Sequence, residues 1–202
     1  MAQGASSGRI SDAHAPVIGR ADLATVPNLL SLARIVGVTA AVLLYFAGYP
    51  RVMIVLGTIA CLTDYLDGYL ARRLSQETVL GAMLDQAADS YTTGIALAML
   101  VIAGGFPFVF LAVFLGREFW VGTVRRYAAM GGLEIPSHVS GKLATGFMYW
   151  SLLLMAVTIM LDIPVPVAAR LRPVATIGMV VGLALSCTAA WRYTQALAGK
   201  GR

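Results

Sequence analysis

Residues 53–103 decide the fold of this chain, and they read MIVLGTIACLTDYLDGYLARRLSQETVLGAMLDQAADSYTTGIALAMLVIA. Two apolar runs, Met53–Ala71 and Ala82–Ala103, are joined here by a short polar segment. An α-helix needs about 20 predominantly apolar residues to cross a bilayer, and both runs approach or exceed that length. The stretch therefore predicts two antiparallel membrane-spanning helices.

Four further apolar runs repeat this pattern along the chain: Leu29–Ala47, Phe106–Met130, Leu143–Leu161 and Val174–Ala198. Gly and Pro punctuate the breaks between runs, as at Gly48-Tyr49-Pro50 and in the segment with Pro164 and Pro166. We therefore expect an all-α integral membrane protein, with a polar N-terminal tail over residues 1–24 and a membrane domain of six transmembrane helices over residues 25–202. Residues 21–28 are expected to form a short juxtamembrane helix at the membrane surface.

The composition excludes several other classes of protein. Of the residues, 58% are hydrophobic and only 12% are charged, whereas a soluble domain carries about 25% charged residues. This balance argues against a soluble enzyme and against a disordered chain. Two cysteines are too few for a disulfide scaffold or a four-cysteine zinc site.

Basic residues give the chain a net charge of +5, and their positions predict its orientation. They lie between the apolar runs, where they set topology and meet anionic lipid headgroups, so we expect no nucleic-acid partner. Six spans place both termini on one side of the membrane. The basic residues of that side are Arg9, Arg20, Arg72, Arg73, Arg125, Arg126, Lys142, Arg192, Lys200 and Arg202, and the opposite side has Arg51, Arg170 and Arg172. The positive-inside rule therefore predicts that both termini are cytoplasmic.

Four carboxylates interrupt the two central spans, where ionisable residues are costly and are a functional hypothesis by default. Asp64 and Asp67 are three residues apart, and Asp85 and Asp89 are four apart, so each pair shares one helix face. Small residues accompany them, namely Gly68, Ala71 and Gly81. Two antiparallel helices can therefore direct four carboxylates at one another across a cleft with room for a ligand.

Like charges at close range cannot all stay ionised without cations. Hard divalent cations such as Mg²⁺ bind carboxylates together with substrate phosphates, and two such ions can clamp a phosphoryl centre. A metal-dependent phosphoryl or phosphatidyl transfer is the reaction favoured by this spacing. Two alternatives stay open: an ion-binding or transport protein that uses the same carboxylates, and a purely structural pairing with Arg34 or Arg117.

The chain contains the pattern Asp-x-x-Asp-Gly-x-x-Ala-Arg, followed after eight residues by Gly-x-x-x-Asp-x-x-x-Asp. This pattern resembles the signature of the CDP-alcohol phosphotransferase family. Its positions are filled by Asp64, Asp67, Gly68, Ala71, Arg72, Gly81, Asp85 and Asp89. The resemblance implies transfer of a phosphatidyl group from CDP-diacylglycerol to an alcohol, with release of CMP. It also implies a homodimer in a bacterial cell membrane, with the active site facing the cytoplasm.

The resemblance also implies roles for individual residues. Asp64, Asp67 and Asp85 would hold one Mg²⁺, and Asp64, Asp85 and Asp89 a second, with Mn²⁺ as an alternative ion. Asp89 would be the general base that takes the proton of the acceptor hydroxyl. The nucleotide-binding candidates are Asn28, Ser31, Asp64, Gly68, Ala71, Arg72, Thr78 and Gly81. For Asn28 the role of helix N-cap is an equal alternative.

The acceptor is predicted from basic residues in the later spans. Arg117 and Arg125 are eight residues apart and so lie roughly on one helix face, and Lys142 begins the fifth span. Guanidinium groups grip phosphate oxygens, so this set suits a phosphorylated alcohol. Arg117-Glu118 and the Ile-Pro…Gly-Lys-x-x-Thr run resemble the phosphatidylglycerophosphate synthase branch, whose acceptor is sn-glycerol 3-phosphate.

Two departures from that branch keep other acceptors open. Ser90 stands where the branch usually has Lys, and Ala144 stands where it has a second Lys. Inositol phosphate, inositol and serine are therefore alternatives. Glu118 is expected to pair with an arginine on its own helix, and the aromatic residues Trp120, Tyr149, Trp150 and Trp191 are expected to anchor the spans in lipid.

Overall fold

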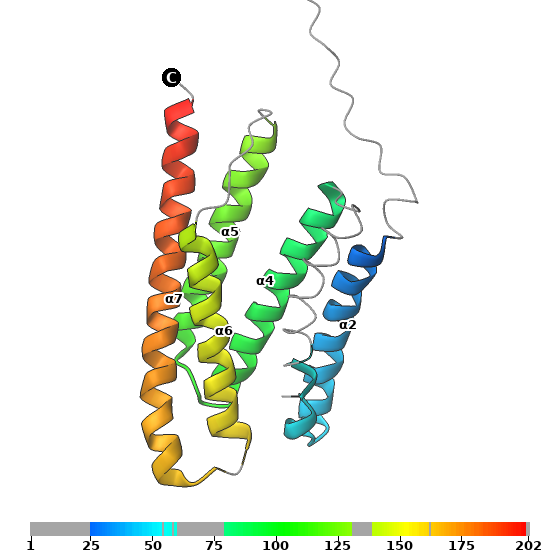
Figure 1. The fold of residues 1–202 in the computed structure, drawn as a ribbon, viewed down its shortest axis with the longest axis vertical. Coiled ribbons are helices and arrows are strands. Elements are labelled where there is room, and N and C mark those ends of the chain that lie inside the picture. The colour runs from blue at the N-terminus through cyan, green and yellow to red at the C-terminus, as the bar shows by residue number, and fades with distance from the viewer. Residues whose placement is uncertain are drawn as a thin grey trace, which may run out of the picture.

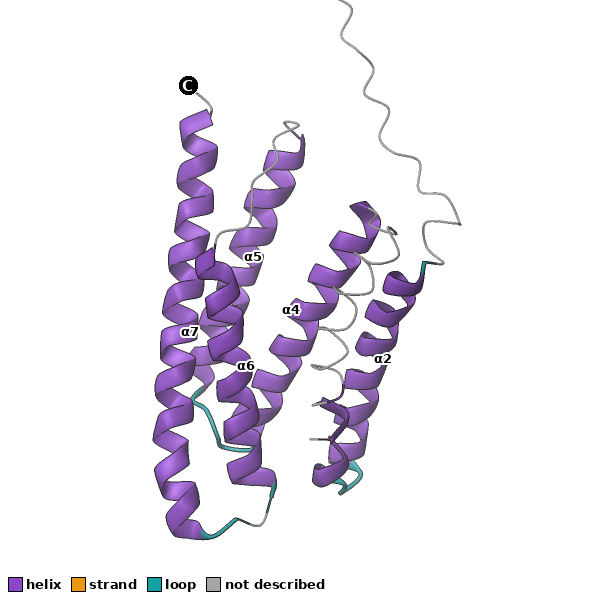
Figure 2. Cartoon of the chain, in the orientation of Figure 1, coloured by secondary structure: helices purple, strands orange, loops and turns teal. Residues whose placement is uncertain are grey.

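The computed structural model describes residues 25–53, 55–57, 59, 79–130, 139–161 and 163–200. Every labelled element in this part of the chain is an α-helix, as predicted (Figure 2). The helices are α2 (Val26–Phe46), α4 (Val79–Ile102), α5 (Phe108–Met130), α6 (Val139–Met160) and α7 (Val165–Lys200). The predicted N-terminal tail and most of the predicted second span lie outside the described residues.

The five labelled helices form a bundle in which α4 lies between α2 and a group made of α5, α6 and α7 (Figure 1). Helices α2, α4 and α6 begin at the end of the bundle where α5 and α7 finish. This alternation agrees with a chain that crosses a membrane repeatedly. The number of spans and the side on which the termini lie stay predictions.

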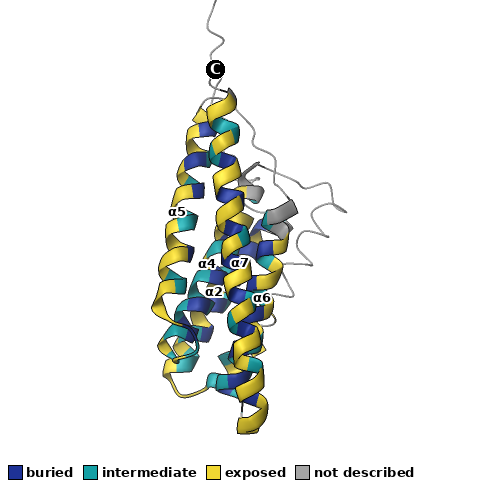
Figure 3. Cartoon of the chain, turned by 90° about the vertical axis from the view of Figure 1, so that its left-hand side faces the viewer, coloured by how far each residue is buried: buried dark blue, intermediate teal, exposed yellow. Residues whose placement is uncertain are grey.

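Three helical segments are long and apolar enough to cross a membrane within the described residues: Asn28–Phe46, Leu143–Met160 and Val165–Gly199. The other two helices, α4 and α5, have 24 and 23 residues and carry the charged side chains discussed below. Exposed residues run along the outside of the bundle (Figure 3). Many of them are large and apolar, among them Val36, Phe119 and Trp150. An outer surface of this kind is suited to lipid rather than to water.

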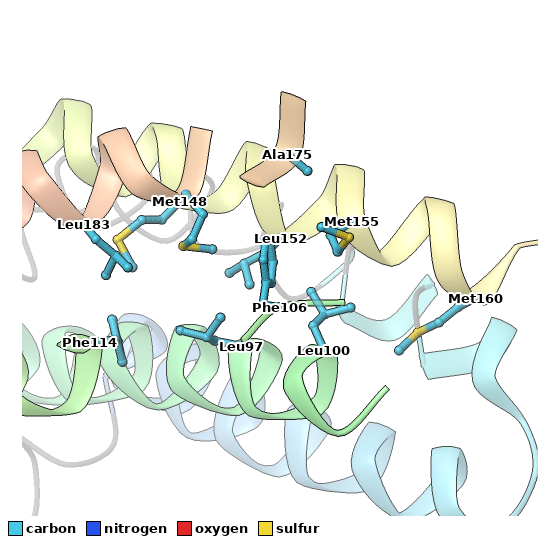
Figure 4. Close-up of a cluster of buried hydrophobic side chains, with 11 residues drawn as sticks. Leu97, Leu100, Phe106, Phe114, Met148, Leu152, Met155, Met160, Ala175 and Leu183 are labelled. Carbon is cyan, nitrogen blue, oxygen red and sulfur yellow. The ribbon is translucent and has the colours of Figure 1, made fainter. Parts of the chain in front are cut away.

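The interior of the bundle is a cluster of apolar side chains from four helices (Figure 4). Leu97, Phe114, Met155 and Met179 are almost completely buried in it. Helices α6 and α7 approach closely because α7 has Gly182 at their contact, where an added Cβ would lie 3.1 Å from the backbone nitrogen of Met148. Small residues at helix interfaces allow such close packing in membranes.

The helix beginnings correct two details of the predictions. Thr25, not Asn28, is the N-cap of α2, and Asn28 lies buried in its first turn. Residues 26–28 therefore belong to α2, and not to a separate juxtamembrane helix. Helix α7 begins at Val165, well before the predicted start of the last span. Pro166 does not break it, because a proline in the first turn removes no intrahelical hydrogen bond.

Candidate functional site

A polar cavity of about 190 Å³ opens between α4, α5, α6 and α7. It lies toward the end of the bundle where α6 begins and α5 and α7 finish. It is lined by Gln86, Asp89, Ser90, Thr93, Phe114, Arg117, Glu118, Arg125, Gly141, Thr145, Met148, Ser186 and Tyr193. The cavity therefore brings together the proposed base, Asp89, and both predicted acceptor arginines.

The two carboxylates of α4 lie one turn apart and have different partners. Asp85 has a half-exposed side chain, and its Oδ1 lies 3.6 Å from a guanidinium nitrogen of Arg34 on α2. The Arg34 side chain is only 1% exposed. Asp89 is partly buried and accepts a hydrogen bond from the Tyr149 hydroxyl on α6. Arg34 is thus the partner of Asp85, a pairing that the sequence left open as a structural alternative.

The predicted nucleotide residues of α2 lie on the same helix face as Arg34. Asn28, Ser31 and Arg34 are three residues apart and are all buried. Because Arg34 reaches Asp85, this face is directed toward the beginning of α4, where Gly81 lies one turn before Asp85. The structure therefore places Asn28 and Ser31 on the side of α2 that faces the α4 carboxylates.

The two cavity arginines are each held by a neighbouring side chain. Arg117 contacts Glu118, as expected for that glutamate. Arg125 lies over the ring of Tyr193, with its guanidinium carbon 5.3 Å from the ring centre. The same guanidinium donates to the Tyr193 hydroxyl at 3.4 Å. A cation over an aromatic face is attracted by the ring quadrupole, so buried Tyr193 fixes the direction of Arg125.

Ser90, which departs from the expected lysine, connects two of the helices. Its hydroxyl donates to Oε2 of Glu118 at 2.6 Å. Glu118 thereby joins α4 to α5 while it also pairs with Arg117. The result is a continuous polar chain along one wall of the cavity.

Asp64, Asp67, Gly68, Ala71, Arg72 and Thr78 lie outside the described residues. Lys142 lies in the first turn of α6 beside Gly141, which lines the cavity, but its side chain is not among those described.

Tyr149 and Tyr193 are residues of the site region that sequence reasoning missed; of the two, Tyr193 lines the polar cavity. Tyr149 was expected to face lipid with the tryptophans, and this is wrong, because its hydroxyl contacts Asp89. Trp150 and Trp191 are exposed, as expected for lipid anchors. From a single sequence, a tyrosine that faces the interior of the bundle is not distinguishable from one that faces lipid on the same apolar helix.

The described carboxylates fit part of a divalent metal site. Asp85 and Asp89 offer hard oxygen donors one helical turn apart, which suits Mg²⁺ or a similar ion. Among the described residues no group of three or more potential ligands gathers, and two of the four predicted aspartates lie outside that part. The described pair is thus compatible with the predicted set.

Fold and site together define a helical membrane protein with a cavity lined by an aspartate and two arginines. A family model described as CDP-alcohol phosphatidyltransferase matches residues 24–188. The chain therefore belongs to the CDP-alcohol phosphatidyltransferase family, whose members generally use a divalent metal.

Curated bacterial relatives carry more specific names. The chain is 37% identical over 116 residues, 55% of its length, to a CDP-diacylglycerol–glycerol-3-phosphate 3-phosphatidyltransferase of Pseudomonas fluorescens, and covers 60% of that protein. It is 37% identical over 135 residues, 64% of each chain, to a probable phosphatidylglycerophosphate synthase of Mycobacterium tuberculosis. It is also 34% identical over 127 residues to a CDP-diacylglycerol–glycerol-3-phosphate 3-phosphatidyltransferase of Salmonella choleraesuis. This match covers 59% of this chain and 70% of that protein.

Proposed function

We propose that this chain transfers the phosphatidyl group of CDP-diacylglycerol to sn-glycerol 3-phosphate and releases CMP. The observation that carries the proposal is the convergence of Arg117 and Arg125 on the cavity that Asp89 lines. A phosphorylated acceptor needs cationic groups for its phosphate and a base for its hydroxyl, and this cavity offers both. The names of the bacterial relatives favour the same acceptor.

In the proposed reaction, Arg117 and Arg125 bind the acceptor phosphate and orient its hydroxyl toward Asp89. The hydroxyl oxygen attacks the phosphorus that carries diacylglycerol, while Asp89 takes the proton. The new oxygen–phosphorus bond forms as the bond from that phosphorus to the bridging oxygen breaks, and CMP leaves. Positioning and electrostatic stabilisation supply most of the rate in transfers of this kind.

We further propose that Asp64, Asp67, Asp85 and Asp89 together hold two Mg²⁺ ions. When bound, such ions neutralise the diphosphate and stabilise the charge of the departing CMP. Asn28, Ser31 and Gly81 are proposed to contact the nucleotide, since the Asn28 and Ser31 face of α2 is directed toward the α4 carboxylates. Gly68, Ala71, Arg72 and Thr78 complete the proposed nucleotide site, and Lys142 joins the acceptor site.

The proposed topology has six spans, cytoplasmic termini and a cavity that opens to the cytoplasm of a bacterial cell. The alternating direction of α4, α5, α6 and α7 supports it (Figure 1). So do Arg125 and Arg192, which lie near the ends of α5 and α7 at one end of the bundle. A cytoplasmic reporter fused after Arg202 should be active, and an active periplasmic reporter there would contradict the topology. A homodimer remains a prediction.

The direct test is CMP release by the purified protein from CDP-diacylglycerol in detergent with Mg²⁺. Separate reactions should contain sn-glycerol 3-phosphate, inositol 1-phosphate, inositol or serine. We expect release with glycerol 3-phosphate alone. Release only with another acceptor would keep the reaction class and replace the substrate. A protein that binds no cytidine nucleotide and releases no CMP would contradict the proposal and favour an ion-binding or transport role.

A further inference from the structure

We propose that Tyr149 is a positioning residue that orients the Asp89 carboxylate within the polar cavity. The proposal rests on the function proposed above, because Asp89 is the base of that reaction. Tyr149 lies on α6 and Asp89 on α4, so the contact joins helices that are far apart in the sequence. The Tyr149 hydroxyl donates to Oδ1 of Asp89.

Tyr149 is not among the residues that line the polar cavity. Tyr149 is partly buried and packs against the apolar cluster that contains Met148 and Leu152 (Figure 4). It also lines a second cavity of about 370 Å³ between α2, α4 and α6, whose walls are mainly apolar and include Val38 and Ala96. Tyrosine suits such a boundary, since its body is apolar and its tip is polar.

The two cavities therefore meet at the Tyr149–Asp89 contact. Asp89 lines the polar cavity with Arg117, and Tyr149 lines the apolar one. Because packing holds the ring of Tyr149, its hydroxyl keeps a fixed position relative to α6. The hydrogen bond then restricts rotation of the Asp89 side chain, which would otherwise turn about its own torsions.

Orientation of the carboxylate affects the rate more than it affects binding. A carboxylate offers about four acceptor positions on two oxygens, so a donor on Oδ1 leaves capacity for a metal ion and for the acceptor proton. A base must lie within hydrogen-bond reach of the proton that it removes, and small displacements of reacting groups are costly. Loss of the Tyr149 hydroxyl should therefore lower kcat and change the KM values little.

The experiment compares Tyr149→Phe with a matched control, Tyr91→Phe. Both substitutions keep the ring and remove one interhelical hydroxyl. The Tyr91 hydroxyl pairs with Thr39 Oγ1 of α2 at 2.9 Å, and Tyr91 is not among the residues that line either cavity. The measurements are kcat, the KM of each substrate, the thermal midpoint, and Mn²⁺ binding followed by electron paramagnetic resonance.

We expect Y149F to lower kcat by about tenfold or more, with both KM values, Mn²⁺ affinity and the thermal midpoint close to those of Y91F. Y91F should keep the wild-type kcat within about twofold, because it does not touch the base. An unchanged kcat in Y149F would overturn the inference. So would a fall in kcat that is matched by a lower thermal midpoint or by equal increases in KM, since these indicate a structural role.

The same assay separates failure of this inference from failure of the proposed function. A wild-type protein that releases no CMP with any acceptor would contradict the proposed function, and this inference would fall with it. An active wild type that loses turnover in D89N but keeps it in Y149F would overturn the role of Tyr149 alone.

Discussion

Replacement of Arg117 by alanine should weaken acceptor binding specifically. Arg117 lines the polar cavity, and its side chain is 18% exposed. Its Nε atom is buried and has no hydrogen-bond partner among the described residues. An unsatisfied buried donor of this kind is suited to an incoming anion, because burial without a partner is costly.

The magnitude follows from the kind of contact that is lost. A hydrogen bond to a charged group contributes about 1.5–3 kcal/mol. Because about 1.4 kcal/mol corresponds to a factor of ten, R117A should raise the KM of glycerol 3-phosphate by about 10- to 150-fold. The KM of CDP-diacylglycerol should change much less, since the arginine is assigned to the acceptor.

Glu118 adds a second effect that a double variant isolates. In R117A the Glu118 carboxylate loses the cation beside it but stays in the cavity wall, bonded to Ser90. Its negative charge then repels the acceptor phosphate. R117A combined with Glu118→Gln should therefore recover part of the lost affinity.

Steady-state CMP release at varied concentrations of each substrate measures these effects. Arg126→Ala is the control, because Arg126 is exposed and donates to the backbone oxygen of Gly122 on its own helix. It is also absent from the cavity lining. An acceptor KM in R117A equal to that of R126A would refute the assignment of Arg117. Equal increases in the KM of both substrates would refute it too.

Two further predictions concern packing and metal dependence. Gly182→Val should lower the thermal midpoint in detergent, with an overpacking cost of about 1–3 kcal/mol, because an added Cβ would meet Met148 and the Ala144 oxygen. Gly116→Ala is the control that should not lower the midpoint, because there is open space around Gly116 and alanine favours a helix over glycine. Equal midpoints for the two variants would contradict the packing account. Chelation by EDTA should abolish CMP release, and excess Mg²⁺ should restore it; full turnover in EDTA would exclude the proposed metal dependence.

Much of the fold was predictable because long apolar runs leave few alternatives to helices. The predicted spans overlap all five labelled helices. The errors lie at helix ends, where the chemistry of individual residues competes with the apolar pattern. Pro166 looked like a break but lies in the first turn of α7. Thr25 is the N-cap of α2, a role that was one of two alternatives for Asn28.

The site was predictable only along single helices. The spacing of Arg117 and Arg125 predicted a shared face, and both line the polar cavity. The contacts between helices were not predictable in this way. Tyr149 meets Asp89, and Ser90 meets Glu118, only after the helices pack. No periodicity within one helix encodes which residue of another helix it will face.

Asp89→Asn tests the central claim most directly, because the substitution keeps the size of the side chain and removes the base. The measurement pairs acceptor-dependent CMP release with binding of a cytidine nucleotide by the same purified variant. The account predicts that turnover is lost while much of the nucleotide binding remains. Turnover by D89N at the wild-type rate would contradict the role of Asp89 as the base, and with it the proposed mechanism.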